Sequence, residues 1–335
     1  MFLLLFSHRQ LSSERLNLEV LTFTPFGTHP ERPAAFASVV VLSFNHERYI
    51  LHTLNSVLTD SDYVGELIVI DDASSDRSQD FVKSWVSEKS PPFAVRLVCK
   101  PTNKGVVNSL NLALSLSKWS RIRFCSSDDL IVPGSILRMN SLLEFDSRKS
   151  IVVGDVSVID ARGEFLSQSL LFDYFKRPKR RYLNCRDMLA EVVNHWRMAG
   201  PYLFVDKRRL LAAGEVWDEK LKIEDWDFML RALIKDQVIF CFDTVGKYRV
   251  SDLNSIFRYK RDHLETLQEE KYILEKNYAL LHGYLRWRLK YRLARVVQKI
   301  AFFEKNSERH YVGFTKFFRD TVALFNSIRT RRDGN

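Results

Sequence analysis

Hydrophobic and polar residues alternate along this chain in blocks that predict strands and helices in turn. Continuous β-branched runs at residues 38–43 and 66–70 are typical of strands that are buried on both faces of a sheet. Between them, residues 47–58 place apolar side chains at helical spacing. The alternation continues with helices expected at 76–86 and 106–116 and strands expected at 94–99 and 121–125. This order predicts an α/β fold with a mostly parallel sheet flanked by helices.

Three polar clusters come directly after predicted strands. They are Phe44-Asn45-His46-Glu47, Asp71-Asp72 and Asp128-Asp129. Because ligands of such sheets bind beyond the carboxyl ends of the strands, we expect the three clusters to converge on one edge. Two adjacent carboxylates at this edge suit a divalent metal and its phosphate ligands. The chain has neither a Gly-x-Gly-x-x-Gly fingerprint after the first strand nor a P-loop, which disfavours a dinucleotide site and a P-loop site.

A further acidic cluster, Glu224-Asp225, lies about a hundred residues after Asp128-Asp129. A carboxylate that the fold brings in from elsewhere suits a general base. Each cluster taken alone could equally be a helix N-cap or a solvated turn. Taken together, the clusters predict chemistry on a nucleotide diphosphate.

The composition is that of a globular protein, with 335 residues of which 46% are hydrophobic. No apolar run approaches the ~20 residues that span a bilayer, and residues 1–6 are too short for the core of a signal peptide. The four cysteines are scattered without a CxxC pair. We therefore expect buried free thiols in a reducing cytosol, with neither a zinc site nor a disulfide framework.

The positive charge is concentrated at the C-terminal end. From Arg258 onward there are 18 Lys/Arg and 9 Asp/Glu, which is +9 of the formal net charge of +10. The pattern there is helical, with an apolar stripe formed by Leu281, Leu285, Leu289, Leu293, Val296, Val297 and Ile300. Arginines flank this stripe, and Tyr284, Trp287 and Tyr291 lie near its polar border. Such a helix suits an anionic membrane surface, or it packs on the rest of the protein with its charges in solvent.

Residues 38–250 resemble a family 2 glycosyltransferase of the GT-A fold, of the bacterial cell-surface polysaccharide type. The motifs that carry the resemblance are Val39–Asn45 with Glu47, Val69–Asp76, Asn103-Lys104-Gly105 with Asn111, Ser127-Asp128-Asp129, and Glu224-Asp225-Trp226-Asp227 followed by Arg231. The resemblance implies a GT-A catalytic domain over 36–255, between an irregular lead-in over 1–35 and a basic helical extension over 256–335.

The same resemblance assigns the residues that bind the nucleotide sugar. They are Phe44, Asn45 and Glu47 around the base and ribose, Asp71 and Asp72 at a base N–H, Asn103 and Gly105 in the adjoining wall, and Asp128. A pyrimidine imide offers the N–H that Asp72 would bind, which favours UDP- or dTDP-linked sugars. The alternative for Asp71-Asp72 is an Asx-turn that caps the next helix.

Metal and catalytic roles also follow from the resemblance. One of Asp128 and Asp129 reaches the ribose or the metal's water shell, and the other ligates Mg²⁺ or Mn²⁺; which of the two is the main ligand stays open, because Ser126 stands where many members carry an aspartate. Asp225 acts as the base in a direct displacement with inversion. Arg249 would touch the diphosphate, although the histidine that often follows it in the family is absent. The basic run 176–181 is either a solvated face or a screen for an anionic acceptor.

The sequence therefore predicts an inverting, metal-assisted glycosyltransferase that acts on a hydroxyl of a glycan or lipid-linked acceptor. We expect it in the cytoplasm or peripherally on the inner face of the cytoplasmic membrane. A nucleic-acid-binding protein is disfavoured because the acidic clusters would repel phosphates. A sugar nucleotidyltransferase would need a glycine-rich basic loop after the first strand, which is missing. A degenerate binding module is disfavoured because Asp128, Asp129 and Asp225 are all present.

Overall fold

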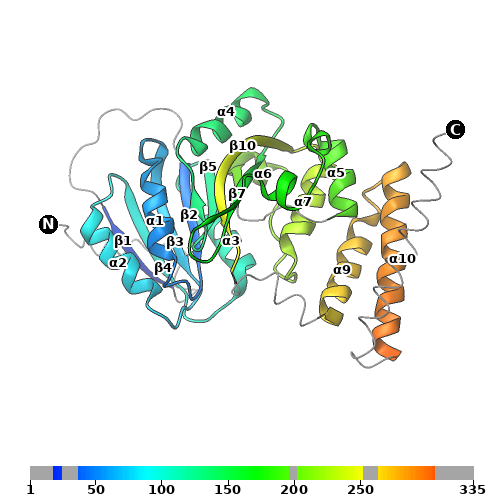
Figure 1. Cartoon of the computed structure of the whole chain (residues 1–335), viewed down its shortest axis with the longest axis horizontal. Coiled ribbons are helices and arrows are strands. Elements are labelled where there is room, and N and C mark those ends of the chain that lie inside the picture. The colour runs from blue at the N-terminus through cyan, green and yellow to red at the C-terminus, as the bar shows by residue number, and fades with distance from the viewer. Residues whose placement is uncertain (1–17, 25–36, 196–201, 252–262, 306–335) are drawn as a thin grey trace. The chain divides into compact units, whose positions relative to one another are not determined.

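The computed structural model describes residues 18–24, 37–195, 202–251 and 263–305. The chain divides into two compact units, Met1–Asn254 and Ser255–Asn335, and each is described below by itself. Figure 1 labels their helices and strands.

One mixed sheet forms the centre of the first unit. Its strands are β1 (Glu19–Phe23), β2 (Ala37–Ser43), β3 (Val64–Asp71), β4 (Ala94–Cys99), β5 (Arg121–Ser126), β6 (Leu130–Ile131), β7 (Ile151–Ile159), β8 (Phe165–Ser167), β9 (Leu203–Asp206) and β10 (Val238–Arg249). In space they follow the order β1-β4-β3-β2-β5-β9-β7-β10-β6, with β8 paired to β7. Strands β4, β3, β2 and β5 are parallel to one another, as are β7 and β10. The predicted mostly parallel sheet is confirmed.

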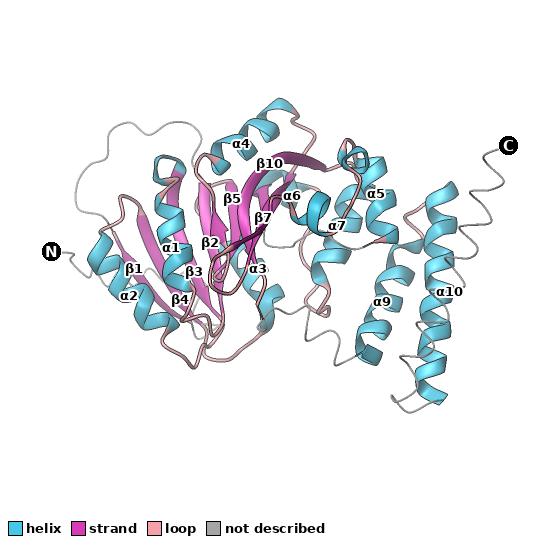
Figure 2. Cartoon of the chain, in the orientation of Figure 1, coloured by secondary structure: helices cyan, strands magenta, loops and turns pink. Residues whose placement is uncertain are grey.

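Helices line this sheet, as Figure 2 shows. They are α1 (Ile50–Leu58), α2 (Ser78–Lys89), α3 (Gly105–Leu116), α4 (Ser135–Phe145), α5 (Cys185–Asn194), α6 (Lys207–Ala212) and α7 (Glu224–Ile234), with short turns η2 (Ser61–Tyr63), η3 (Leu170–Tyr174) and η4 (Lys179–Tyr182). The central strands are covered on both sides, because Val39, Val40 and Val41 of β2 are all inaccessible to solvent. This burial is why their sequence is continuously apolar instead of alternating. All four cysteines are buried free thiols, as expected.

The first strand was not predicted. Residues 19–23 belong to the segment expected to be an irregular lead-in, yet they form β1, which pairs antiparallel with β4. An edge strand needs backbone partners on one side only, so it forms here without a continuous apolar run. The rest of residues 1–35 lies outside the described part of the chain.

Strands β6 and β10 position the turn that carries Asp128-Asp129. Gly246 of β10 pairs with Ile131, directly after this turn. A Cβ atom at Gly246 would lie 2.8 Å from the Leu130 carbonyl oxygen and 2.9 Å from the Tyr202 ring. Only a glycine therefore allows the close approach that holds the turn against β10.

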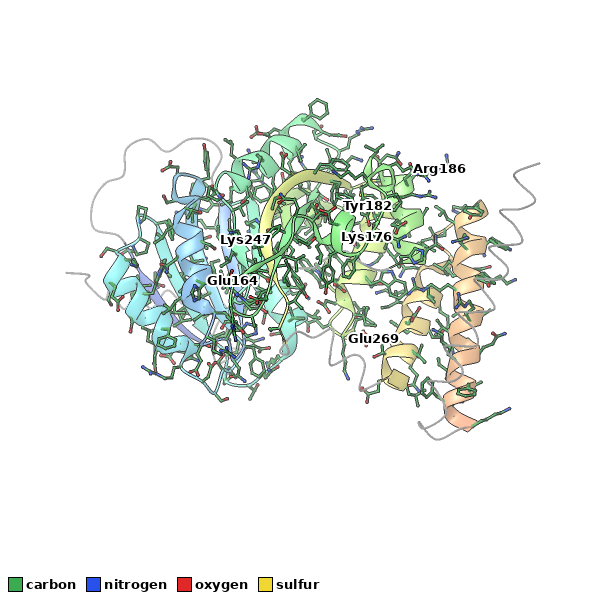
Figure 3. All side chains as sticks on the ribbon, in the orientation of Figure 1. Glu164, Lys176, Tyr182, Arg186, Lys247 and Glu269 are labelled. Atoms are coloured by element: carbon green, nitrogen blue, oxygen red, sulfur yellow. The ribbon has the colours of Figure 1, made fainter. Side chains whose placement is uncertain are left out.

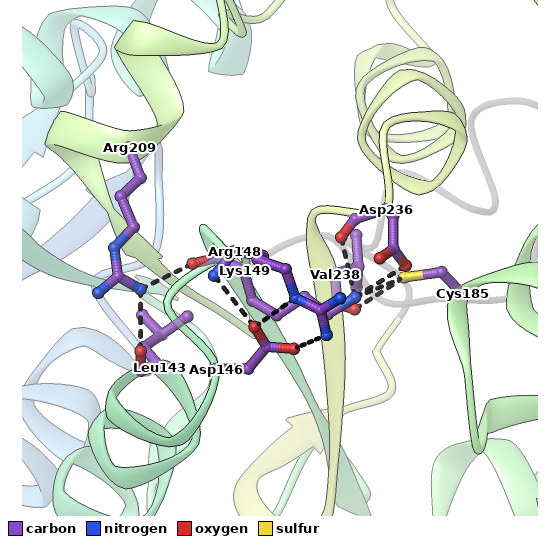
Figure 4. A network of polar contacts seen from close by, with 8 residues as sticks. All are labelled: Leu143, Asp146, Arg148, Lys149, Cys185, Arg209, Asp236 and Val238. Atoms are coloured by element: carbon purple, nitrogen blue, oxygen red, sulfur yellow. Dashed lines mark hydrogen bonds and ion pairs between the residues drawn. The ribbon is translucent and has the colours of Figure 1, made fainter.

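A polar network joins the starts of β7 and β10 (Figure 4). The buried Lys149, just before β7, donates from Nζ to the carbonyl oxygen of Asp236 at 2.9 Å and pairs with its carboxylate at 2.8 Å. The backbone carbonyl of Lys149 accepts a hydrogen bond from Arg209 at 2.9 Å. These contacts join the turn between α7 and β10 to the start of β7.

The second unit contains α9 (His263–Tyr278) and α10 (Gly283–Lys305), which pack on each other. Arg292 Nε donates to Glu270 Oε1 at 2.7 Å across the pair. Leu289 and Val296, from the predicted apolar stripe, are buried. Much of that stripe is therefore a packing face. None of the described helices has the length and apolar character needed to cross a membrane.

Candidate active site

The loops that follow β2, β3, β4 and β5 lie side by side. The Asp72 amide donates to the Ser43 carbonyl at 2.9 Å, and the Ser127 amide donates to the Leu42 carbonyl at 2.9 Å. The Lys100 amide reaches the Asp71 carbonyl at 3.0 Å. The structure thus brings the three polar clusters together at the carboxyl edge of the sheet.

Asn45 and Glu47 brace the loop after β2 against the loop after β3. Asn45 has a left-handed φ of 55°, a conformation in which asparagine is enriched. Its Oδ1 accepts from the Ser75 amide at 2.8 Å, and Glu47 Oε2 accepts from the Arg77 amide at 3.0 Å. These side chains therefore hold the two loops together. Phe44, at the head of the first loop, is half-buried.

Asp71 binds within its own loop, to the residue three positions ahead, whereas the expected Asx-turn would bond two positions ahead. Its Oδ1 accepts from the Ser74 amide at 2.9 Å, and its Oδ2 accepts from the Ser74 hydroxyl at 2.6 Å. Gln79 Nε2 adds a further hydrogen bond at 2.7 Å. These three hydrogen bonds hold the carboxylate of Asp71 within the loop after β3 and against the start of α2.

Asp72 is held from the other side by the loop before α3. Its carboxylate accepts from the amides of Lys104 and Gly105 at 2.9 and 2.7 Å and pairs with Lys100 Nζ at 2.6 Å. A carboxylate has about four acceptor sites, so these three contacts leave Asp72 one more hydrogen bond to accept. Asn103 supports the same turn, because its Oδ1 also accepts from the Gly105 amide, at 3.0 Å.

Lys100 is a buried cation that the sequence did not single out. Its Nζ also donates to Asn108 Oδ1 at 3.1 Å and to Ser109 Oγ at 2.9 Å. Burial lowers the pKa of Lys100, while the hydrogen bond and the charge of Asp72 oppose this shift. The opposite charges of Lys100 and Asp72 compensate each other inside the fold. Together with the two backbone amides, the ion pair fixes the orientation of the Asp72 carboxylate.

The Asp128-Asp129 turn is tied down from α1 and β10. Thr53 Oγ1 lies 2.8 Å from the Ser127 carbonyl and 2.7 Å from the Asp129 carbonyl. The Arg249 amide donates to Asp129 Oδ1 at 2.8 Å. Burial, followed by the charge of Asp128, raises the pKa of Asp129. The Asp129 carboxyl therefore faces the protein interior.

Asp128 lies next to His46 and is also buried, with 5% of its surface exposed. The His46 Nδ1 atom is 4.0 Å from Asp128 Oδ1 and 2.7 Å from Ser127 Oγ. The described residues contain no group of three or more His, Cys, Asp or Glu side chains arranged to hold a metal. Mg²⁺ that binds together with substrate phosphates usually has only one or two carboxylate ligands from the protein. Asp128 could be such a ligand.

Arg249 is buried beneath the turn. Its Nε donates to the Asp128 carbonyl at 2.8 Å, and its Nη1 donates to the Asp160 carbonyl at 3.0 Å. The guanidinium lies 4.6 Å from the centre of the Tyr49 ring. These contacts make Arg249 a positioning residue for the turn, whereas the sequence suggested contact with a diphosphate.

The second acidic cluster begins α7. Asp225 is half-buried, and its Oδ1 accepts from the Trp226 amide at 2.8 Å. Glu224 and Asp227 are both buried, and Asp227 Oδ2 pairs with Arg231 Nε at 2.9 Å. Asp225 is thus the most accessible carboxylate of the three.

Tyr248 of β10 connects the two acidic clusters. Burial is the largest cause of its raised pKa, and the negative charges of Asp129, Asp128 and Asp225 add to the shift. Both clusters therefore lie within electrostatic reach of one phenol, although they are about a hundred residues apart in sequence.

Several residues of this site escaped the sequence analysis. They are His46, Thr53, Lys100, Tyr202 and Tyr248. Of these, only His46 carried a signal, because it lies within the polar cluster that follows β2.

Comparisons with known proteins indicate the family and the fold of this chain. Residues 38–201 match Glycosyl transferase family 2. The chain is 24% identical to an uncharacterized glycosyltransferase of Haemophilus influenzae over 198 residues, which cover 58% of this chain and 61% of the relative. It is 31% identical to the putative teichuronic acid biosynthesis glycosyltransferase TuaG of Bacillus subtilis over 94 residues, which cover 28% of this chain and 35% of TuaG. The chain thus spans less than two thirds of the length of each relative.

Two solved structures share the fold. S. aureus TarS 1–349 in complex with UDP-GlcNAc has a TM-score of 0.57 and 18% identity, over 83% of this chain and 73% of TarS. The mannosyltransferase PcManGT from Pyrobaculum calidifontis, in complex with GDP-Man and Mn²⁺, has a TM-score of 0.55 and 18% identity, over 90% and 83% of the two chains. The predicted GT-A fold is confirmed by this likeness. Residues 38–201, which begin with β2, are thus a glycosyl transferase family 2 domain.

Proposed function

We propose that this chain transfers a sugar from a nucleotide diphosphate sugar to a hydroxyl group of a glycan or lipid-linked acceptor, with inversion at the anomeric carbon. The observation that carries the proposal is the convergence of the loops after β2, β3 and β5, which brings the Asp128-Asp129 turn to the carboxyl edge of the sheet. A diphosphate binds at this edge in such folds. Asp225 begins α7, and its charge acts on Tyr248 of β10 together with the charges of Asp128 and Asp129.

Asp225 takes the role of the base. It removes the proton from the acceptor hydroxyl while that oxygen attacks the anomeric carbon and the diphosphate leaves. The accessibility of Asp225, compared with the buried Glu224 and Asp227, favours it within the cluster. This direct displacement needs no second carboxylate as a nucleophile. We therefore propose that the configuration at the anomeric carbon is inverted.

Asp72 takes the role of the base-reading group. Its last acceptor site suits an N–H donor, which uracil and thymine present and cytosine lacks at the corresponding position. UDP- and dTDP-linked sugars are therefore the favoured donors. A guanine N–H would satisfy the same site, so GDP-linked sugars belong in the same test.

Asp128 would hold a divalent ion, Mg²⁺ or Mn²⁺, together with the donor phosphates. Such an ion would neutralise the negative charge that develops on the departing diphosphate. The inward orientation of Asp129, with the Arg249 amide on its carboxylate, favours Asp128 as the ligand. His46, next to Asp128, helps to fix the carboxylate in place.

For the acceptor, we propose a role in polysaccharide biosynthesis in the cytoplasm. Peripheral contact with an anionic membrane would use the solvent-facing side of α10, where Tyr284, Trp287 and Tyr291 are exposed and stacked. This helix carries seven Lys/Arg and one Glu.

A panel of nucleotide sugars, read by thermal shift with Mn²⁺ and with EDTA, tests the proposal. A bound donor stabilises by mass action, and UDP- or dTDP-sugars should give the largest shifts, only with the metal present. Replacement of Asp72 by Ala should abolish the preference for bases with an N–H donor. Equal shifts with all nucleotides, or with EDTA, would contradict the assigned roles of Asp72 or of Asp128, respectively.

A further inference from the structure

A basic and aromatic segment lies next to the candidate active site. It runs from η3 through η4 to the first turn of α5, over residues 172–186 (Lys176, Tyr182 and Arg186 are labelled in Figure 3). Phe172 in this segment contacts Phe240 and Phe242 of β10, the strand that carries Tyr248. The following helix α5 is joined to α7, because Trp226 Nε1, next to Asp225, donates to the Val192 carbonyl at 3.1 Å.

The positive charges in this segment are of two kinds. Arg177 pairs with Glu191 at 2.6 Å, and Arg181 approaches Asp187 at 3.8 Å. The other four, which are exposed and have no carboxylate within ion-pair distance among the described residues, are Lys176, Lys179, Arg180 and Arg186. Like charges held on one short segment repel each other, so a ligand with negative charge gains binding energy there.

Aromatic rings lie among these cations. Phe172 stacks on Phe242 at 6.0 Å and meets the Tyr182 ring edge-on at 5.5 Å. Lys179 Nζ is 5.3 Å from the centre of the Phe172 ring. Phe242 is 42% exposed and Tyr174 is 48% exposed, so ring surface is available to a ligand. Rigid aromatic faces next to cations suit a ligand that is apolar on one side and anionic on the other.

We infer that this segment binds the acceptor and that the acceptor is an anionic glycan. This inference rests on the proposed function, since only a glycosyltransferase needs an acceptor here. The sugar rings lie on the aromatic cluster, and carboxylate or phosphate groups of the glycan lie on the four cations. The contacts of this segment with β10 and, through α5, with α7 direct the end of such a chain towards Asp225. The enzyme thereby selects its acceptor by the negative charge of the glycan as well as by the position of the reacting hydroxyl.

Calorimetry with three defined probes tests the inference, with UDP and Mn²⁺ present. The probes are a tetrasaccharide that contains glucuronate, a neutral tetrasaccharide of N-acetylglucosamine, and glycerophosphoglycerol as a phosphodiester. The wild-type protein should bind a charged probe at least about tenfold more tightly than the neutral one, with the preference decreasing at high salt. The two charged probes separate a preference for carboxylate from one for phosphate.

The matched variants remove three cations each. The triple variant Lys176→Gln, Lys179→Gln, Arg180→Gln should lower the affinity for the preferred charged probe by about tenfold and leave the neutral probe unchanged. The control variant Lys83→Gln, Lys89→Gln, Lys118→Gln removes the same charge from α2 and from the link after α3, and it should change neither affinity by more than about twofold. Equal losses in the two variants, or no preference in the wild type, would overturn the inference.

The affinity for UDP with Mn²⁺, measured in each variant, separates this inference from the proposed function. It should be the same in all three proteins, because none of the substituted residues contacts the loops after β2, β3 or β5 through a hydrogen bond. If the wild type failed to bind any nucleotide, the proposed function would be wrong. If UDP bound normally and the charged probes did not, only the acceptor inference would be wrong.

Discussion

The two sides of the candidate active site differ in how their charges are partnered. On the sheet edge, the carboxylates of Asp71, Asp72 and Asp129 are buried and accept hydrogen bonds from backbone or side-chain donors within the fold. On the opposite side, Asp225 is half-buried, and cations such as Lys179 are exposed without a carboxylate partner among the described residues. The sheet edge is therefore pre-organised without a ligand, whereas the exposed charges of the other side remain available to pair with a ligand.

This difference has an energetic consequence. A carboxylate that several donors hold is pre-organised, and its removal leaves buried donors unsatisfied. A solvated charge costs little to remove from the fold itself. Substitutions on the sheet edge should therefore reduce stability and ligand binding together, whereas substitutions on the opposite side should reduce turnover or acceptor binding alone.

The sharpest test of this comparison is Asp225→Asn. Asparagine keeps the size of the side chain but does not accept a proton, so kcat should fall about 10²–10⁴-fold. The affinity for UDP with Mn²⁺ and the melting temperature should stay near the wild-type values. Steady-state kinetics and calorimetry measure these quantities.

Glu224→Gln and Asp227→Asn are the controls for that variant. Asp227→Asn should lower stability, because Arg231 loses a buried partner, and it should retain more turnover than Asp225→Asn. If Asp225→Asn kept normal turnover while either control abolished it, the base would be a different member of the cluster.

Asp128 and Asp129 provide the second test, because they are adjacent in sequence but face different surroundings. Asp128→Asn should reduce the Mn²⁺-dependent part of UDP affinity by about 100-fold, since substitution of groups that only support metal ligands already costs 10–100-fold. Asp129→Asn can still accept from the Arg249 amide and should retain most of that affinity. The reverse pattern in a calorimetric titration would transfer the metal role to Asp129.

The parts of the fold that follow from local pattern could be predicted from the sequence. The apolar runs of β2 and β3 and the acidic residues that follow β3 and β5 identify the sheet edge, because burial on both faces leaves a continuous signature. Strand β1 could not be predicted in this way, since it depends on an antiparallel partner more than seventy residues away.

Residue roles within the site were harder to predict for a related reason. Lys100 follows β4 in a short polar stretch, and nothing nearby in sequence indicates that it is buried against Asp72. Asp129 and Asp128 have the same chemistry, and the hydrogen bond from the Arg249 amide of β10 to Asp129 distinguishes them. Long-range contacts decide such roles, and a single sequence does not display them.

The link between the two sides of the site can be tested at Asn111. Its Nδ2 donates to the Trp217 carbonyl at 2.9 Å, and its Oδ1 accepts from the Trp217 amide at 3.1 Å. Trp217 stacks at 4.3 Å on Phe228 of α7, the helix that carries Asp225. Asn111→Ala should lower the free energy of unfolding by about 1–3 kcal/mol.

Urea denaturation measures this loss, and Ser115→Ala on the exposed side of α3 serves as the control. Asn111→Ala should also lower kcat more than UDP affinity, because it loosens α7 and spares the sheet edge. Unchanged stability would mean that the contact does not hold α7 in place.

The solvent-facing side of α10 is expected to have a smaller effect. Lys290 is exposed on this helix, and a basic residue near an anionic bilayer contributes about 1 kcal/mol, which is about fivefold in partitioning. Lys290→Gln should therefore reduce cosedimentation with anionic liposomes about fivefold at low salt. Lys271→Gln on α9 is the control, and an equal effect of both variants would contradict a specific role for α10.

The smallest expected effect concerns Asp236 and the pH dependence of stability. The hydrogen bond from Lys149 lowers the pKa of Asp236 below its ordinary value. Because the folded-state pKa is the lower one, the stabilisation is present above the unfolded-state pKa of about 4 and is lost as the pH falls through the folded value. Asparagine keeps the backbone contact and suits the left-handed φ of 56°, so Asp236→Asn removes only the charge.

The side chain of Asp236 is 58% exposed, so water screens the pair and the expected loss of stability at pH 7 is below about 1 kcal/mol. Urea denaturation at several pH values should show the wild type and Asp236→Asn converging as the pH falls below about 3. Both proteins should be equally stable there, because the wild-type carboxyl is then protonated. A difference that stayed constant from pH 7 to pH 3 would assign the effect to packing at the turn before β10, and the charge of Asp236 would have no part in it.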